Sequence, residues 1–151
     1  MAAASAAQPA QIWRDDCYYL NRDTGECERK YVLVLAVDGR SDGLVTAVFT
    51  TKSHGLSEHP ACSLGPPRGG YFVGIPGGVL TQPTWVEFNS IQDVDRQDWE
   101  RLQRGGRVHL LPLALPMAVF CGVLRCLSGF DDLTGRQAKL IGDLAAAIKC
   151  P

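Results

Sequence analysis

Two short segments of the chain carry the side chains best suited to chemistry at a phosphate group. Arg29 and Lys30 precede a run of aliphatic residues, and residues 50–54 (TTKSH) follow a second such run. In an antiparallel pair the start of one strand lies beside the end of its neighbour, so we expect the two segments to meet at one rim of a sheet. Cations, hydroxyls and an imidazole gathered there could bind a phosphodiester and assist its cleavage.

Each group suits a different part of that chemistry. Cleavage of RNA through its own 2′-hydroxyl needs assisted proton transfer and stabilisation of the charge that develops on the phosphate oxygens. Arg29 is always protonated and matches phosphate with two parallel hydrogen bonds, so we expect it to act electrostatically. The hydroxyls of Thr50 and Thr51 would position phosphate oxygens. His54 could act as acid or base near neutral pH, and Glu26 or Glu28 could act as a base or pair with Arg29.

The same residues also have ordinary structural explanations, which the sequence leaves open. A basic pair such as Arg29 and Lys30 is typical of a solvated strand end, and threonine is a common strand residue. A lone loop histidine is usually exposed and without a role, and charged turns usually serve solvation. Trp13, Trp85 and Trp99 could stack on bases, although core packing is the more frequent role, at least for Trp85 and Trp99.

Hydrophobic patterning predicts a mainly β protein of the α+β class, in which a small antiparallel barrel or curled sheet precedes C-terminal helices. Strands are expected over residues 12–20, 31–37, 44–49, 71–75, 84–88 and 107–111, with a long loop over 52–70. Asp95 predicts the N-cap of a short helix, and Pro116 suits the first turn of a buried helix over 115–127. An apolar stripe predicts a final helix over 134–149. Residues 1–10 are expected to be disordered, and residues 11–151 to form one domain.

Composition limits the class of protein. A chain of 151 residues that is 46% hydrophobic and 21% charged is typical of one globular domain rather than a disordered or coiled-coil protein. The net charge of -1 argues against a protein that coats nucleic acid, but it allows a local basic groove. No apolar run is long enough to span a membrane, since Pro112, Pro116 and Arg125 interrupt residues 110–127.

The six cysteines and three histidines lack the spacing of a metal site. We therefore expect neither a metal nor another cofactor. The N-terminal residues also lack the basic and apolar parts of a secretory signal. We therefore expect a cytoplasmic protein whose cysteines stay reduced.

Four segments, taken in order, resemble motifs of the PemK/MazF toxins of bacterial toxin–antitoxin modules. They are residues 12–16 (IWRDD), 25–30 (GECERK), 50–55 (TTKSHG) and 89–95 (NSIQDVD). Each segment is short, but four in the family's order are fairly specific and cover roughly residues 11–127.

The resemblance implies an SH3-like small barrel that forms a homodimer and acts as a metal-independent endoribonuclease on single-stranded RNA. It also implies neutralisation by a cognate antitoxin. The family's catalytic arginine and threonine correspond here to Arg29 and to Thr50 or Thr51, and Glu26 is the nearest match to its glutamate. Residues proposed for catalysis are Arg29, Thr50, Thr51, Glu26 and His54, and those proposed for RNA binding are Trp13, Lys30, Lys52, Ser53, Ser90 and Gln92.

Three positions depart from the family pattern and keep other functions open. Lys30 replaces the proline after the arginine, Ser90 replaces a glutamine and Gln92 replaces an arginine. One alternative is a catalytically weak barrel that binds a protein partner or regulates a neighbouring system. Another is a toxin of the same fold that acts on a protein target such as DNA gyrase. The helix over 134–149 exceeds the family's minimum and could cover the barrel, extend a dimer interface or receive a partner.

Overall fold

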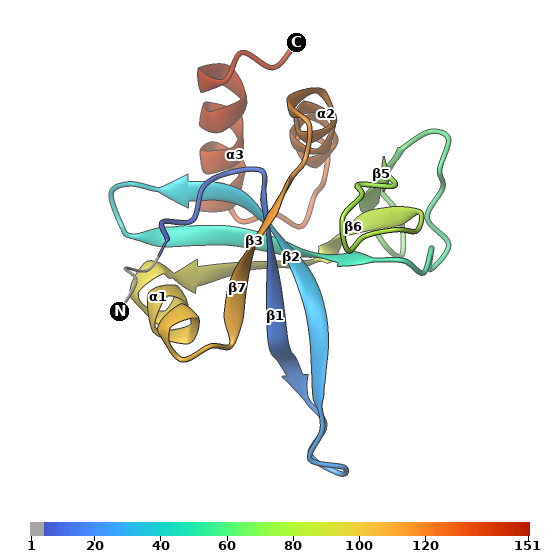
Figure 1. Cartoon of the computed structure of the whole chain (residues 1–151). Helices are drawn as coiled ribbons and strands as arrows, with labels where there is room; N and C mark the ends of the chain where they lie inside the picture. The colour runs from blue at the N-terminus through green and yellow to red at the C-terminus, as the bar shows by residue number, and fades with distance from the viewer. Residues whose placement is uncertain (1–4) are drawn as a thin grey trace.

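A seven-stranded antiparallel sheet forms the centre of the computed structural model, which describes residues 5–151. Its strands are β1 (Gln11–Leu20), β2 (Cys27–Asp38), β3 (Gly43–Thr50), β4 (Cys62–Ser63), β5 (Gly70–Gly74), β6 (Thr84–Asp95) and β7 (Val108–Ala114). They lie in the order β4-β5-β6-β3-β2-β1-β7 (Figure 1). The mainly β class is confirmed, but the sheet is open over these residues, with β4 and β7 as its edges. The short β4, inside the expected loop, was not predicted.

The neighbouring strands β2 and β3 are buried on both faces over most of their paired length, as the aliphatic run over 31–37 predicts for β2. Successive side chains of a strand point to opposite faces, so β2 contributes to two separate cores. Leu33 packs with Phe88 and Phe120 in one core, and Val34 packs with Trp13 in the other. This double burial makes β2 the rigid element that holds the residues at its N-terminal end.

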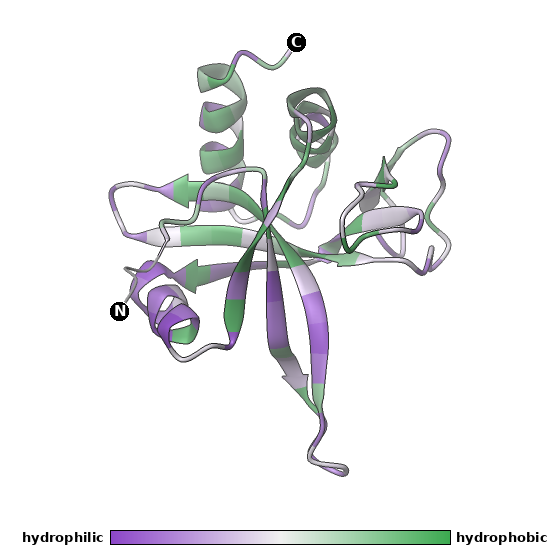
Figure 2. Ribbon diagram, in the orientation of Figure 1, coloured by the Kyte–Doolittle hydropathy of each residue, from purple (hydrophilic) through white to green (hydrophobic). Residues whose placement is uncertain are grey.

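In the described part of the chain, three helices complete the fold: α1 (Arg96–Arg104), α2 (Met117–Leu127) and α3 (Gly135–Ala147). Asp95 caps α1 by accepting hydrogen bonds from two backbone N–H groups, and Thr134 caps α3 in a capping box with Gln137. Figure 1 shows α2 and α3 together on one side of the sheet. The green bands of Figure 2 mark the apolar segments of the strands and of these two helices. Within residues 5–151, no helix combines the length and apolar character needed to cross a membrane.

The N-terminal segment, residues 1–10, is hydrogen-bonded to the sheet through its last residue, Ala10. Residues 1–4 of the segment expected to be disordered lie outside the described part of the chain. Ala10 is buried; its N–H donates to the carbonyl of Val34, and its carbonyl accepts from the N–H of Leu115. Ala10 therefore connects β2 to the segment that follows β7.

All six cysteines are paired, as Cys17–Cys27, Cys62–Cys126 and Cys121–Cys150. The expectation of reduced thiols is wrong for this structure, because the fold brings cysteines that are 10 to 64 residues apart within bonding distance. Disulfides persist mainly in oxidising compartments. These pairs therefore do not support a reducing cytoplasm, and the cytoplasmic location stays a prediction.

Candidate functional site

A surface pocket opens where β2 and β3 separate. The two strands pair from Asp38 and Gly43 as far as Val32 and Val48. Beyond that point β2 continues along β1 to Cys27, whereas β3 continues along β6. Figure 1 shows β1 and β2 leaving the body together as an arm. We call the resulting cavity of about 510 Å³ the fork pocket; residues 28–31, 49–52, 54, 79–82 and 84 line it.

The structure brings six of the predicted site residues to this one pocket. They are Arg29, Lys30, Thr50, Thr51, Lys52 and His54. The first two come from the start of β2 and the others from the end of β3 and the turn that follows, which is the convergence expected from antiparallel pairing. Their part in catalysis stays a prediction.

Trp13 is misassigned, because it is 0% exposed and so cannot stack on an RNA base. Its ring lies edge-on to that of Trp99, with 5.3 Å between ring centroids. Trp13 lies on the same face of the sheet as Val32, which places it under α1.

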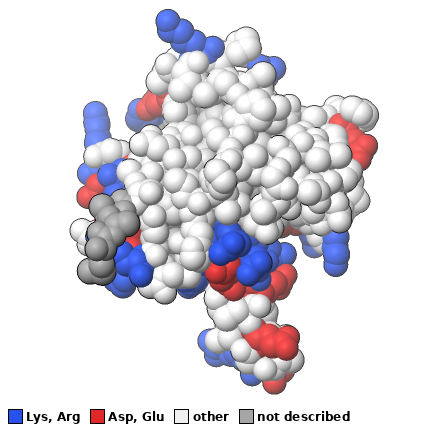
Figure 3. Space-filling model, in the orientation of Figure 1, with Lys and Arg blue, Asp and Glu red and all other residues white. Residues whose placement is uncertain are grey.

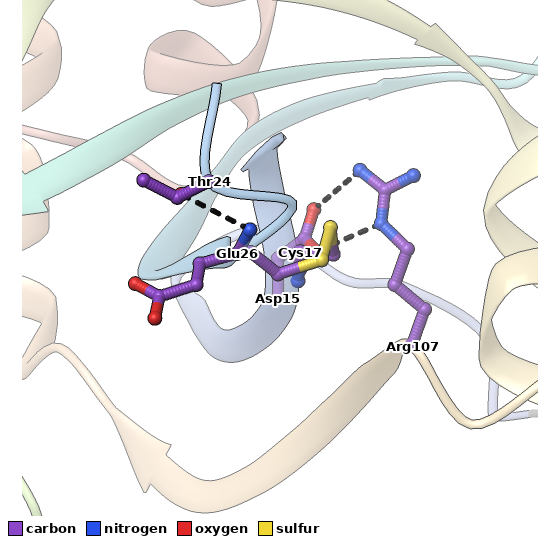
Figure 4. The surroundings of a disulfide bond; sticks show 6 residues. Asp15, Cys17, Thr24, Glu26 and Arg107 are labelled. Carbon is purple, nitrogen blue, oxygen red and sulfur yellow. Dashed lines mark hydrogen bonds and ion pairs between the residues drawn. A yellow bond between two sulfur atoms is a disulfide. The ribbon is translucent and has the colours of Figure 1, made fainter. Parts of the chain in front are cut away.

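Four other candidates lie outside the lining of the fork pocket. Glu26 is in the exposed turn of the arm, where its N–H donates to Thr24 Oγ1 (Figure 4). Ser90 Oγ accepts from the N–H of Val48 and donates to the carbonyl of Glu87, so it fills an irregularity between β3 and β6. Ser53 and Gln92 also do not line the pocket. The glutamate that does line it is Glu28, which the sequence offered beside Glu26 as a base or as a partner of Arg29.

The fork pocket is electropositive. Its lining holds three cations, Arg29, Lys30 and Lys52, against one carboxylate, Glu28, which leaves two positive charges in excess. Lys30 Nζ lies 3.0 Å from Glu28 Oε1. Lys52 forms no ion pair with any residue in the 5–151 range. His54 Nε2 lies 3.6 Å from Glu87 Oε1, outside the lining.

Thr50 shapes the turn at the pocket wall. Its Oγ1 accepts from the N–H of Lys52 at 3.1 Å and lies 3.2 Å from the carbonyl of Lys52. Two residues later His54 and Gly55 adopt positive φ angles of 49° and 85°. These backbone conformations reverse the chain after β3 and bring the imidazole back to the pocket. The hydroxyl of Thr51 is on an exposed residue.

Asp16 was missed by sequence reasoning, although it holds the main candidate, Arg29. Its Oδ1 accepts from Arg14 Nε at 2.8 Å and from Arg29 Nε at 3.1 Å, and its Oδ2 lies 3.1 Å from His109 Nε2. Partial desolvation opposes ionisation of Asp16. The hydrogen bond from Arg14 and the charges of Arg14, Arg29 and His109 outweigh it and lower the pKa of Asp16. The spacing of Arg14 and Asp16, which puts both on one strand face, was the available signal.

An ion pair and a disulfide fix the base of the arm. Asp15 is 3% exposed, and both of its oxygens accept from Arg107, at 2.9 and 3.1 Å. Figure 4 shows this pair beside the Cys17–Cys27 disulfide. The hydrogen bond from Arg107 to Asp15 outweighs partial desolvation and raises the pKa of Arg107. The disulfide therefore joins β1 to β2 next to the pocket, and the ion pair joins β1 to the residue that precedes β7.

Comparisons of the chain with protein-family models, with curated proteins and with solved structures find no match. The resemblance to PemK/MazF toxins therefore remains a hypothesis. Within residues 5–151, no group of three or more His, Cys, Asp or Glu side chains is arranged to hold a metal ion. The fork pocket itself offers cations for an anion, hydroxyls for its oxygens and one imidazole for proton transfer. This set suits a phosphodiester.

Proposed function

We propose that this protein is a metal-independent endoribonuclease that cleaves single-stranded RNA in the fork pocket. The observation that carries the proposal is the meeting of Arg29, Thr50 and His54 around one electropositive cavity. Proximity in the sequence does not explain this meeting of residues. Arg29 and Thr50 come from two strands, β2 and β3, that no longer pair with each other at these positions. The order of the four motifs is an independent reason to favour RNA as the substrate.

The residues support an internal transfer reaction. The 2′-oxygen of RNA attacks phosphorus, forming one P–O bond while the bond to the 5′-oxygen of the next nucleotide breaks. His54 accepts the proton of the 2′-hydroxyl, and water supplies the proton to the leaving 5′-oxygen. The hydroxide that this leaves then takes the proton from His54, which restores the imidazole. Arg29 and Lys52 stabilise the charge on the phosphate oxygens. The products are a 2′,3′-cyclic phosphate and a 5′-hydroxyl end.

Mapping of cut ends tests the proposal. Purified protein is incubated with a long unstructured RNA in EDTA, beside Arg29→Gln and the matched control Arg101→Gln. Arg101 is 74% exposed on α1, outside the pocket. We expect discrete cuts with wild-type protein and with the control, and none with Arg29→Gln. Absence of cuts from folded wild-type protein would contradict the proposal.

The resemblance adds further parts to the proposal. They are an SH3-like strand arrangement, a homodimer, neutralisation by a cognate antitoxin and a cytoplasmic location. Trapping thiols in intact cells with an alkylating reagent tests the location. Free cysteines support the cytoplasm, whereas three intact disulfides argue for an oxidising compartment.

A wide uncharged surface favours the second candidate function, a catalytically weak protein-binding module. Figure 3 shows a broad area without Lys, Arg, Asp or Glu above the base of the arm. Exposed apolar side chains include Leu110 on the edge strand β7 and Met117 at the start of α2. A tight protein complex without RNA cleavage would support this function, and a topoisomerase assay would identify a gyrase-directed toxin.

A further inference from the structure

Three neighbouring strands place a group of cationic side chains around Asp16. Arg14 pairs with Tyr31 of β2 and with His109 of β7 in the sheet. Asp16 follows two residues later on β1, where it contacts Arg14, Arg29 and His109. We call these four residues the Asp16 cluster.

Asp16 leaves the ends of both arginines available. Each guanidinium contacts Asp16 through Nε, and within residues 5–151 neither Arg14 nor Arg29 forms another side-chain hydrogen bond. Their terminal amino groups, which suit a phosphate, therefore have no protein partner in that range. The side chains of Arg14 and Arg29 are 30% and 57% exposed, so a ligand can reach them.

The cluster keeps a positive charge beside the fork pocket. Two guanidinium groups face one carboxylate, which leaves one positive charge. Because Arg29 is shared, the fork pocket and the cluster together hold four cations, Arg14, Arg29, Lys30 and Lys52, against two carboxylates, Asp16 and Glu28. Figure 3 shows basic and acidic atoms next to each other over β1 and β2. Exposed ion pairs stabilise a fold by little, so folding alone does not require this excess of cations.

We propose that Arg14 and Arg29, held together by Asp16, form a second phosphate-binding subsite for the RNA strand. Arg29 belongs to the cluster and also lines the fork pocket, so the subsite is continuous with the pocket. A strand with one phosphate in the pocket presents the neighbouring phosphate of its backbone to Arg14. Asp16 acts as a positioning residue that keeps the two guanidinium groups at one place. The identity of the ligand rests on the proposed function.

Binding of uncleavable RNA to Arg14→Gln tests the subsite. The probes are 2′-O-methyl oligonucleotides, a dinucleotide with one phosphodiester and an octanucleotide. We expect Arg14→Gln to bind the octanucleotide about fivefold more weakly and to lower the salt slope by about 0.7, the value for one contact to a single strand. Dinucleotide binding should not change. With cleavable RNA, KM should rise while kcat stays the same.

Arg101→Gln is the matched control, because it removes the same charge from an exposed site on α1. Equal thermal unfolding midpoints verify that both variants are folded. Unchanged octanucleotide affinity and salt slope in Arg14→Gln would overturn the subsite, as would an equal loss for the dinucleotide. If wild-type protein cleaves RNA and Arg14→Gln behaves like it, the proposed function stands without the subsite. If the octanucleotide binds through Arg14 but no RNA is cut, the subsite stands and the proposed function fails.

Discussion

Cys17 of β1 is bonded to Cys27 of β2, one residue from Asp16 and two residues from Arg29. The bond joins the strands where their register shifts, between Asp15 and Tyr19. Such a shift leaves residues of one strand without a regular partner and weakens local pairing. The disulfide therefore limits how far Arg29 can move relative to Asp16 and to the fork pocket.

Replacing both cysteines, Cys17→Ser with Cys27→Ser, should lower the free energy of unfolding by about 2 to 3 kcal/mol, because it frees the short loop in the unfolded chain. It should also reduce RNA cleavage, since Arg29 loses its fixed place. Urea unfolding and initial cleavage rates measure the two effects. The matched control is Cys121→Ser with Cys150→Ser, which lies away from the pocket lining and should lower stability alone. Equal cleavage losses in both pairs would contradict a local role of the arm disulfide.

Substitutions of the two threonines should separate a turn-forming hydroxyl from one that contacts substrate. Thr50→Val removes the hydrogen bonds to Lys52, so we expect about 1 kcal/mol lower stability and about tenfold slower cleavage. Thr50→Ser keeps the hydroxyl and should restore both. Thr51→Val should slow cleavage with unchanged stability. Unfolding and cleavage assays on all three variants test this, and normal cleavage by Thr50→Val would count against its role.

Trp13 should act only through folding. Trp13→Ala should lower the free energy of unfolding by about 3 to 5 kcal/mol, because it removes a fully buried ring packed on Trp99. Trp13→Phe keeps a ring and should cost less. Once folded, Trp13→Phe should bind RNA as wild-type protein does. Weaker RNA binding by folded Trp13→Phe would restore the original assignment.

Asp38 makes stability depend on pH. It accepts hydrogen bonds from the Ser41 hydroxyl and the Arg40 N–H and one from Arg136 of α3, and these hold its pKa far below the ordinary value of 3.8. A lowered folded pKa gives stability that is complete above 3.8 and is lost as pH falls through the folded value. Asp38→Asn should therefore be less stable than wild-type protein at pH 7, with a smaller difference near pH 2. Urea unfolding at both pH values measures this.

The control for Asp38 is Asp23→Asn, which alters an exposed turn carboxylate that forms no ion pair within residues 5–151. Its stability difference from wild-type protein should stay small at both pH values. A difference for Asp38→Asn that is as large near pH 2 as at pH 7 would show that Asp38 contributes through shape rather than charge.

Local patterns were enough to predict most elements of the fold. The aliphatic run over 31–37, the Asp95 cap and the apolar stripe of α3 depend on neighbours within a few residues, and each appears where expected. Antiparallel pairing also brought Arg29 and Thr50 to one pocket. The two-residue β4 was missed, because so short a strand carries no periodicity of its own.

The sequence by itself determined the order of the longer strands and of the helices along the chain, the burial of β2 and β3, and the residue types available for phosphate chemistry. Only the tertiary structure decided that the sheet stays open, that Trp13 is buried, that the cysteines pair and that Asp16 holds Arg29. The physical reason is the separation along the sequence of the residues that interact. Helix and strand preferences come from adjacent residues, whereas contacts such as Asp16 with His109 and Cys62 with Cys126 join residues 93 and 64 positions apart. Those contacts exist only after the chain has folded.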